Sequence, residues 1–282
     1  MVRPNLQGRR VLWAYIGVIL VSLLGFEAHA QQAPPVAAPQ TQFRPLDDFL
    51  IQETDEDDVP TSLFSRVSFE YDHASFSGGA DNDRYRIKGQ QAFGPKHRLS
   101  FGYEIPFVDA HRTGSVQSAS GLGDVKLIAS AVLGDTGKFK NAAAAEFTFP
   151  SASNDVSGLG QTIIKAVWSF TTPLGASTAL SGILGYNKAV ETNKGQQGIN
   201  TLEPQTVLVH KFNGRVAGYL DYDTYEDFNV DRFGQTLKGG LTFGLDPRLR
   251  WSLSPYAQFP LNHFTSSTNI KSDVGIELTW RY

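Results

Sequence analysis

The sequence contains no cysteine, and this absence excludes several classes of protein. Its 282 residues include a single methionine and no cysteine. A disulfide scaffold, a cysteine-ligated zinc site, an iron–sulfur cluster and a cysteine nucleophile are therefore ruled out. The sequence also has little excess of one charge over the other, since 25 basic and 28 acidic residues leave a formal net charge of -3. Nucleic-acid-binding proteins need basic residues clustered on one face, so we expect no nucleic-acid partner.

Long hydrophobic runs are lacking beyond the first thirty residues. Residues 1–30 are interpreted as a secretory signal peptide, because three arginines precede an apolar run from Val11 to Phe26. Ala28-His29-Ala30 then has the small-x-small form of a cleavage site. The run is shorter than the ~20 residues that cross a bilayer as a helix, which favours a signal peptide over a membrane anchor. No apolar run long enough to cross a bilayer as a helix follows residue 30, which excludes a helical membrane protein.

Residues 31–60 are predicted to form a disordered, acidic periplasmic segment. The part from Gln31 to Gln42 is rich in glutamine, proline and alanine, a composition typical of disorder. Seven carboxylates follow between Asp47 and Asp58. Such a run is usually a solvated tail, and the alternatives are a cation-binding segment or a small plug that folds into a lumen.

Residues 61–282 alternate apolar and polar side chains, which is typical of β-strands with two different faces. In residues 274–282, every even position is apolar and every odd position is polar or glycine. Twelve segments of about nine to thirteen residues follow this pattern, and a tilted membrane strand needs about 9–11. Three of them, 177–187, 201–212 and 215–225, fit less cleanly. The sequence predicts an all-β fold, a transmembrane up-and-down antiparallel β-barrel of about twelve strands.

The connections between these segments alternate in length. Five short and six long connections fit an even-stranded outer-membrane barrel with both ends in the periplasm. Asn213-Gly214 is also a strong signal for a two-residue hairpin turn. A soluble sandwich or lipocalin-like barrel is the alternative, but the signal peptide and the loop asymmetry favour the cell outer membrane. The short connections are 94–97, 134–140, 173–176, 213–214 and 246–249; the long ones are 73–82, 109–121, 151–160, 188–200, 226–233 and 261–269.

The apolar face is predicted to meet lipid. The nine clear segments carry no charge on this face, where a lysine or arginine would cost about 2–4 kcal/mol at the bilayer midplane. Aromatic residues near the strand ends would form the two interfacial girdles. The girdle candidates are Tyr71, Phe107, Phe149, Phe170, Trp251, Phe259, Trp280 and Tyr282.

The polar face would then line a lumen. Basic and acidic residues are nearly balanced on it, which favours internal ion pairs over a pore constriction or a ligand clamp. A group of neighbouring basic residues, Arg66, Arg84, Arg86 and Lys88, is the best candidate for contact with an anionic or phenolic solute. Twelve strands lie between a filled barrel of eight and an open one of sixteen, so a narrow passage is expected. The lumen candidates are Arg66, Glu70, Arg84, Arg86, Lys88, Glu104, Lys126, Glu146, Lys165, Lys238, Glu277 and Arg281.

Three motifs resemble the phenol-degradation-pathway (MetA-type) outer-membrane transporter family. They are Phe101–Pro106, then Gly121-Leu122-Gly123-Asp124 opening a strand, then Glu146–Ser151. Ser151 departs from the Thr-Gly expected after the proline in that family. The resemblance covers about residue 62 to the C-terminus, and it implies a barrel that admits hydrophobic or aromatic compounds. Gly121 and Gly123 allow a tight entry into a strand, and Asp124 can cap that turn through backbone N–H groups.

The sequence therefore favours an outer-membrane channel or transporter for small solutes, and not an enzyme. A structural or adhesive barrel without transport is the alternative, and an outer-membrane hydrolase is a weaker one. The hydrolase would use an Asp/His pair on predicted outer loops, either Asp72-His73 or Asp109 with His111. The sequence has no Gly-x-Ser-x-Gly elbow and no histidine pair with metal-ligand spacing, so neither a cofactor nor a metal is expected. The expected partners are the lipid bilayer, the outer-membrane assembly machinery and a small-molecule solute, with the monomer and the homo-oligomer both left open.

Overall fold

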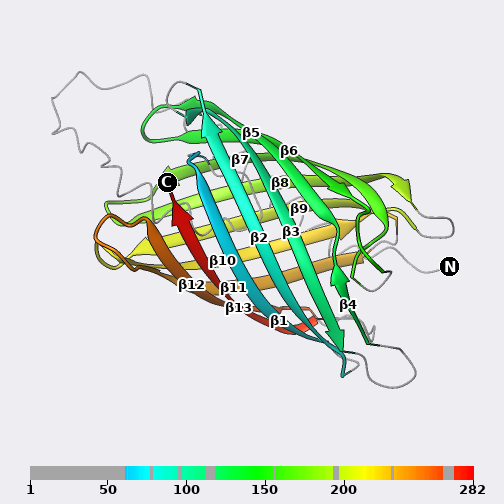
Figure 1. Ribbon diagram of the computed structural model, residues 1–282. Coiled ribbons are helices and arrows are strands. Elements are labelled where there is room, and N and C mark those ends of the chain that lie inside the picture. Colours follow the sequence, from blue (N-terminus) through cyan, green and yellow to red (C-terminus); the bar gives the residue numbers. More distant parts are fainter. Residues whose placement is uncertain are drawn as a thin grey trace, which may run out of the picture.

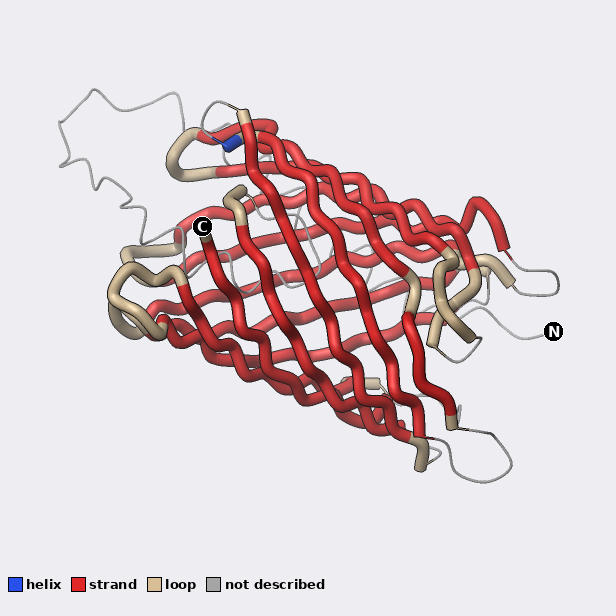
Figure 2. The backbone as a smooth tube through the Cα atoms, viewed as in Figure 1, coloured by secondary structure: helices blue, strands red, loops and turns tan. Residues whose placement is uncertain are grey.

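The computed structural model describes residues 61, 63–76, 79–94, 97–111, 118–154, 157–192, 197–229, 232–262 and 270–282. The predicted signal peptide (1–30) and the predicted acidic segment (31–60) lie outside these residues. The described part of the chain is almost entirely β-strand, arranged as one barrel (Figures 1 and 2). Within it, we find no helix with the length and apolar character needed to cross a membrane.

All neighbouring strands pair in antiparallel fashion. β1 pairs with β2 and β13, and β2 also pairs with β3, which closes the sheet. Both β4 and β5 pair with β3, so they form a single interrupted barrel strand. The barrel therefore has the twelve strands that the sequence predicted. The strands are β1 (Arg66–Phe76), β2 (Asp81–Phe93), β3 (Leu99–His111), β4 (Ala119–Leu122), β5 (Val125–Asp135), β6 (Lys140–Phe149), β7 (Gln161–Pro173), β8 (Thr178–Thr192), β9 (Asn200–Lys211), β10 (Val216–Asp227), β11 (Arg232–Gly244), β12 (Trp251–Pro260) and β13 (Ile270–Arg281).

The interruption between β4 and β5 is made by Gly123 and Asp124, a short loop-coloured stretch in Figure 2. The Gly123 N–H donates to the Pro106 carbonyl at 2.8 Å, and a Cβ on Gly123 would lie 2.9 Å from Pro106 Cγ. Only glycine fits this close approach. Asp124 accepts hydrogen bonds from the N–H groups of Ala152 (3.1 Å) and Leu159 (2.6 Å). The carboxylate thus binds two residues of the long connection between β6 and β7, which gives the Gly-Leu-Gly-Asp motif a structural role.

Several connections predicted to be long are shorter, because the strands extend further than the alternation indicated. β1 and β2 are joined by residues 77–80, and β10 and β11 by residues 228–231. β8 also continues to Thr192. Alternation is imposed where one face meets lipid and the other does not. Beyond the lipid band both faces are polar, so the backbone pairing continues where the sequence pattern has ended.

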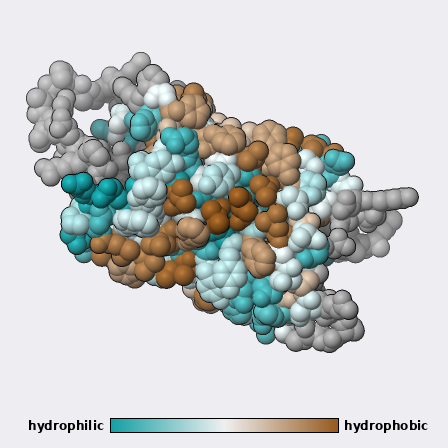
Figure 3. All heavy atoms as spheres, in the orientation of Figure 1, coloured by the Kyte–Doolittle hydropathy of each residue, from teal (hydrophilic) through white to brown (hydrophobic). Residues whose placement is uncertain are grey.

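The outer face of the barrel is apolar, as predicted. Phe69 (58% exposed), Leu220 (49%) and Leu241 (42%) point away from the lumen. Figure 3 shows apolar side chains gathered across the middle of one face, with hydrophilic residues toward its two ends. Closure pairs the backbone groups along every strand, which hydrocarbon requires. The fold is that of a membrane-spanning barrel, and its placement in the outer membrane agrees with the sequence.

Aromatic residues gather near both ends of the outer face. Tyr71 and Tyr85 have ring centroids 5.2 Å apart on the side of the long loops. Trp251 and Trp280 are stacked at 5.9 Å on the side of the short turns. The other girdle candidates are also exposed, namely Phe107, Phe149, Phe259 and Tyr282.

Phe170 differs from the other girdle candidates, because it is only 6% exposed. Its ring stacks on Phe139 with centroids 5.6 Å apart, and a Cβ on Gly182 would lie 2.3 Å from it. The ring fills the space above this glycine on the neighbouring strand and is covered by Phe139. It therefore packs within the barrel wall, and it does not present a free face to the membrane interface.

Candidate functional site: the lumen

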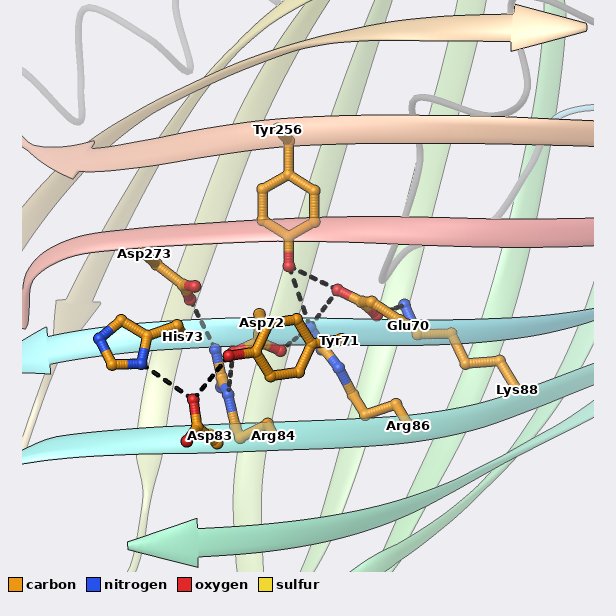
Figure 4. A network of polar contacts seen from close by, with 10 residues as sticks. All are labelled: Glu70, Tyr71, Asp72, His73, Asp83, Arg84, Arg86, Lys88, Tyr256 and Asp273. Carbon is orange, nitrogen blue, oxygen red and sulfur yellow. Dashed lines mark hydrogen bonds and ion pairs between the residues drawn. The ribbon is translucent and has the colours of Figure 1, made fainter. Parts of the chain in front are cut away.

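One wall of the lumen, on β13, β1 and β2, carries a group of paired charges that we call the charged cluster. Even positions of β1 and β2 point inward, so alternate residues of each strand contribute (Figure 4). The cluster comprises Glu70, Asp72, Arg84, Arg86, Lys88 and Asp273.

Arg84 joins two strands that are both neighbours of β1. Its Nε donates to Asp72 Oδ1 at 2.6 Å, and its Nη2 donates to Asp273 Oδ2 at 2.6 Å. The Asp72 side chain has no exposed area, and that of Asp273 is 6% exposed. One guanidinium therefore spans from β2 across β1 to β13 and neutralises two buried carboxylates.

Glu70 contacts the other two basic residues of the charged cluster, Arg86 and Lys88. Arg86 Nη2 donates to Glu70 Oε1 and, at 2.8 Å, to Asp72 Oδ2, while Lys88 Nζ lies 2.8 Å from Glu70 Oε2. The Tyr256 hydroxyl, which reaches in from β12, donates to Glu70 Oε1 at 2.6 Å. Removing one partner from such a buried network leaves the opposite charge buried and unpaired. This lowers the free energy of unfolding by about 3–5 kcal/mol.

The structure places all twelve lumen candidates on inward-facing positions. Lys126 Nζ lies 3.5 Å from Glu104 and 4.0 Å from Glu146, so it bridges β3 and β6 from β5. Lys165 lies 3.3 Å from Glu203. Three of the remaining candidates contact aromatic rings: Lys238 lies over Tyr256 (4.0 Å), and Arg66 and Arg281 lie over Phe64 (6.0 and 4.6 Å). Glu277 of β13 is the direct cross-strand partner of Glu70 on β1.

Sequence reasoning missed two carboxylates of the charged cluster. Asp72 was expected beside His73 at the start of an outer loop, but it is fully buried and faces the lumen. Adjacent residues of a strand point to opposite faces, so Asp72 and His73 cannot act as a pair. Asp273 was not singled out, although continuing the alternation back from Glu277 by two steps of two residues reaches it.

On the opposite side of the barrel, β6 to β10 carry a buried cluster of small and branched apolar side chains that point inward, each no more than 6% exposed. We call this the apolar wall. These inward residues explain why the segments 177–187, 201–212 and 215–225 alternate poorly, since apolar side chains interrupt their polar face. The same inward face also carries Ser181, Gln205 and Asp221. Tyr219 and Tyr256 border the wall, with 7% of each exposed. The apolar wall consists of Ala142, Val167, Ile183, Val207, Val209 and Ala217.

The chain just before β1 crosses the mouth of the barrel on the side of the short turns. Thr61 Oγ1 donates to Thr171 Oγ1 of β7 at 2.9 Å, although β7 is nearly opposite β1 in the ring of strands. Leu63 is 5% exposed, and Ser65 Oγ accepts a hydrogen bond from Gln91 Nε2 at 2.8 Å. Residues 61 and 63–65 therefore narrow this opening, next to the apolar wall.

Comparison with solved structures finds membrane channels with the same fold. An outer-membrane channel from Pseudomonas putida F1 superposes with a TM-score of 0.61 at 12% identity, covering 81% of this chain and 98% of that one. The NanC porin gives 0.54 at 10% identity, with 77% and 100% covered. A KdgM porin in complex with disordered oligogalacturonate gives 0.53 at 9% identity, with 77% and 99% covered. At these identities the likeness establishes the fold.

No curated protein matches this sequence. Residues 73–270 match the family described as "Putative MetA-pathway of phenol degradation". This match confirms the resemblance carried by the three motifs and extends over more than half of the chain. The chain therefore belongs to this phenol-degradation family of outer-membrane barrels.

Proposed function

We propose that the barrel is an outer-membrane channel for small solutes that combine an aromatic or hydrophobic part with a polar group. The observation that carries this proposal is the two-sided lumen. The charged cluster on β13, β1 and β2 faces the apolar wall on β6 to β10, with Tyr256 between them. A solute with one polar and one apolar edge can satisfy both sides at once, as specific sites with few polar groups do.

The comparisons support the channel and the solute class to different degrees. The similar barrels named above are channels or porins, and none of them is described as an enzyme. The aromatic character of the solute is supported by the description of the family, which refers to phenol degradation. In this proposal the role of the lumen is passage and not catalysis.

The proposal includes the chain outside the barrel. We expect residues 1–30 to be removed on export and residues 31–60 to remain in the periplasm. The crossing of Thr61 to Thr171 supports a narrow periplasmic opening. Insertion by the outer-membrane assembly machinery is part of the proposal, and each barrel encloses its own lumen whether it is a monomer or part of a homo-oligomer.

Single-channel recording in a planar bilayer tests the proposal. Benzoate is the probe, and acetate is the matched control because it carries the same carboxylate without the ring. We expect small conductance steps with concentration-dependent interruptions by benzoate and none by acetate. Equal effects of the two anions would contradict the solute class. Complete absence of conductance would favour the structural barrel, for which the crossing at the periplasmic mouth is the supporting observation.

A further inference from the structure

Three polar side chains lie together on the outer surface, at the end of the barrel that carries the long loops. His73 and Ser75 are on β1, and Asp83 is the direct cross-strand partner of His73 on β2. His73 Nδ1 lies 2.9 Å from Asp83 Oδ1, and His73 Nε2 lies 3.5 Å from Ser75 Oγ. Figure 4 shows the His73 ring and the Asp83 carboxylate facing each other across β1 and β2. We call these three residues the rim cluster.

We propose that the rim cluster is a serine hydrolase site that cleaves acyl esters of lipids in the outer leaflet. A hydroxyl, an imidazole and a carboxylate in this order are the three groups that activate a serine nucleophile. With the Nδ1 proton donated to Asp83, the Nε2 atom is left to accept the proton of Ser75. Asp83 acts through His73, and is therefore a positioning residue.

Neighbouring side chains hold Asp83 in place. The Tyr71 hydroxyl donates to Asp83 Oδ1 at 2.8 Å, and His111 Nε2 lies 3.7 Å from Asp83 Oδ2. The Asp83 side chain is 22% exposed and that of His73 is 37% exposed, so the cluster is open to a ligand. In the described part of the chain, no three His, Asp or Glu side chains are placed to hold a metal ion, so the cluster does not have the geometry of a metal centre.

The register of β1 against β13 shifts between Ser75 and Phe76, where Lys271 of β13 is passed over, while Ser75 keeps its regular pairing with Asp81 of β2. The 3.5 Å separation between Ser75 Oγ and His73 Nε2 is long for a catalytic hydrogen bond, as is usual before substrate binds.

A groove next to the rim cluster can hold the acyl chain of the substrate. It has a volume of about 490 Å³ and lies on the outer surface of β1, β2, β3, β12 and β13. Tyr71 belongs to the groove and also bonds Asp83, so the two sites adjoin. The groove opens toward hydrocarbon, and the rim cluster lies at the polar end of the strand. An acyl chain in the groove therefore brings its ester toward Ser75. The apolar lining includes Phe69, Tyr71, Tyr85, Ile87, Phe107 and Ile276.

The reaction balances with water as the second reactant. Ser75 Oγ bonds to the ester carbonyl carbon while its proton passes to His73 Nε2. The bond from that carbon to the alcohol oxygen breaks, and the alcohol leaves with the proton from His73. Water then attacks the acyl–serine, gives a proton to His73, and releases the fatty acid as Ser75 regains its hydroxyl proton. The net change is ester and water to acid and alcohol, and no step passes through the lumen.

The opposite rim supplies a matched control. There, Thr178 Oγ1 and His210 Nδ1 lie 2.9 Å apart on exposed side chains. The other contact described for His210 is with the ring of Phe212, at 5.0 Å between centroids. This pair has a hydroxyl and an imidazole, but among the described residues no carboxylate contacts His210 as Asp83 contacts His73. A His210→Gln variant therefore tests whether loss of a surface histidine outside the rim cluster affects hydrolysis.

The test uses the full mature protein, folded in detergent and also in phosphatidylethanolamine vesicles. Fatty-acid release and labelling by a fluorophosphonate are measured for wild type, Ser75→Ala, His73→Gln, Asp83→Asn and His210→Gln. We expect background release for Ser75→Ala and His73→Gln, a loss of about 10²–10⁴ in kcat with unchanged KM for Asp83→Asn, and wild-type release for His210→Gln. The fluorophosphonate should label Ser75 in wild type, as identified by peptide mass spectrometry.

Two results would overturn the proposal. One is wild-type release at the level of protein-free vesicles with Ser75 unlabelled. The other is release that persists in Ser75→Ala, which would assign the activity elsewhere. Heat-modifiable migration on a gel and unchanged single-channel conductance of each variant confirm that the barrel is folded, so that a loss of hydrolysis reports on the rim cluster.

Discussion

Tyr256 and Glu70 are hydrogen-bonded at 2.6 Å although their strands are not neighbours. The tyrosine extends from β12 over β13 to reach β1, and its ring lies against Gly275 of β13. The bond connects the charged cluster to the apolar side of the lumen. It therefore ties together the two halves of the proposed solute path.

A Tyr256→Phe substitution removes this hydroxyl and leaves one bond of Glu70 unmade. Loss of a buried hydrogen bond to a charged group costs about 1–3 kcal/mol, so we expect a lower thermal unfolding midpoint. Thermal unfolding followed by circular dichroism in detergent measures this. Tyr282→Phe is the control, because its hydroxyl bonds Gln91 at 3.2 Å on the exposed surface and should matter little. Equal midpoints for the two variants would show that the Tyr256 bond contributes nothing.

A Gly275→Ala substitution should displace the Tyr256 ring. The added Cβ would lie 2.4 Å from Tyr256 Cζ, which is too close for two carbon atoms. Overpacking of this kind costs about 1–3 kcal/mol and should also alter conductance. Gly239→Ala is the matched control on β11, since its Cβ would meet nothing closer than 3.6 Å. The idea fails if both alanine variants unfold at the same temperature and conduct alike.

A cysteine pair at positions 61 and 171 should form a disulfide. The two threonine oxygens lie 2.9 Å apart, and the natural chain has no cysteine to compete. Under oxidation, we expect the double variant Thr61→Cys/Thr171→Cys to yield a linked peptide after proteolysis, as detected by mass spectrometry. Thr61→Cys combined with Thr236→Cys should not, because β11 holds Thr236 near the opposite end of the barrel. Absence of the first linked peptide would contradict the crossing at the mouth.

The turn between β11 and β12 should weaken in acid through Asp246. Hydrogen bonds from the backbone N–H groups of Trp251 and Arg248 hold the pKa of the Asp246 carboxyl below its ordinary value. A carboxyl whose pKa is lowered by folding stabilises the fold above its unfolded pKa, and this contribution is lost as pH falls through the folded pKa. We expect the difference in unfolding midpoint between wild type and Asp246→Ala to shrink from about pH 6 to about pH 3. A difference that stays constant would show that the ionised form is not what stabilises the turn.

Much of the fold could be predicted from the sequence, because lipid imposes a period of two on every strand it touches. That constraint identified twelve strands and the outward faces of residues such as Leu241 and Trp280. It could not identify the ends of β1 and β2, where both faces are polar. It also failed in β9, where inward Val207 and Val209 resemble the outward residues in hydropathy. Alternation alone does not distinguish lipid from an apolar lumen.

The candidate site was harder to predict, because pairing across strands depends on register. Alternation placed Arg84, Arg86 and Glu70 on the inner face, but it could not show that Arg84 bonds Asp72 and Asp273 together. The rim cluster depends on register in the same way. The pairing of His73 with Asp83, in preference to its sequence neighbour, follows only from the hairpin between β1 and β2.

The contact of Arg84 with Asp273 has a consequence for biogenesis. It connects the second strand of the barrel to the last one, so it can form only once the C-terminal strand has been synthesised and has joined the first. A chain shortened by that strand would leave the edges of β1 and β12 unpaired in the bilayer, and Arg84 would lose one of its two carboxylate partners. Pairing of the last strand with the first is therefore the final step of barrel assembly.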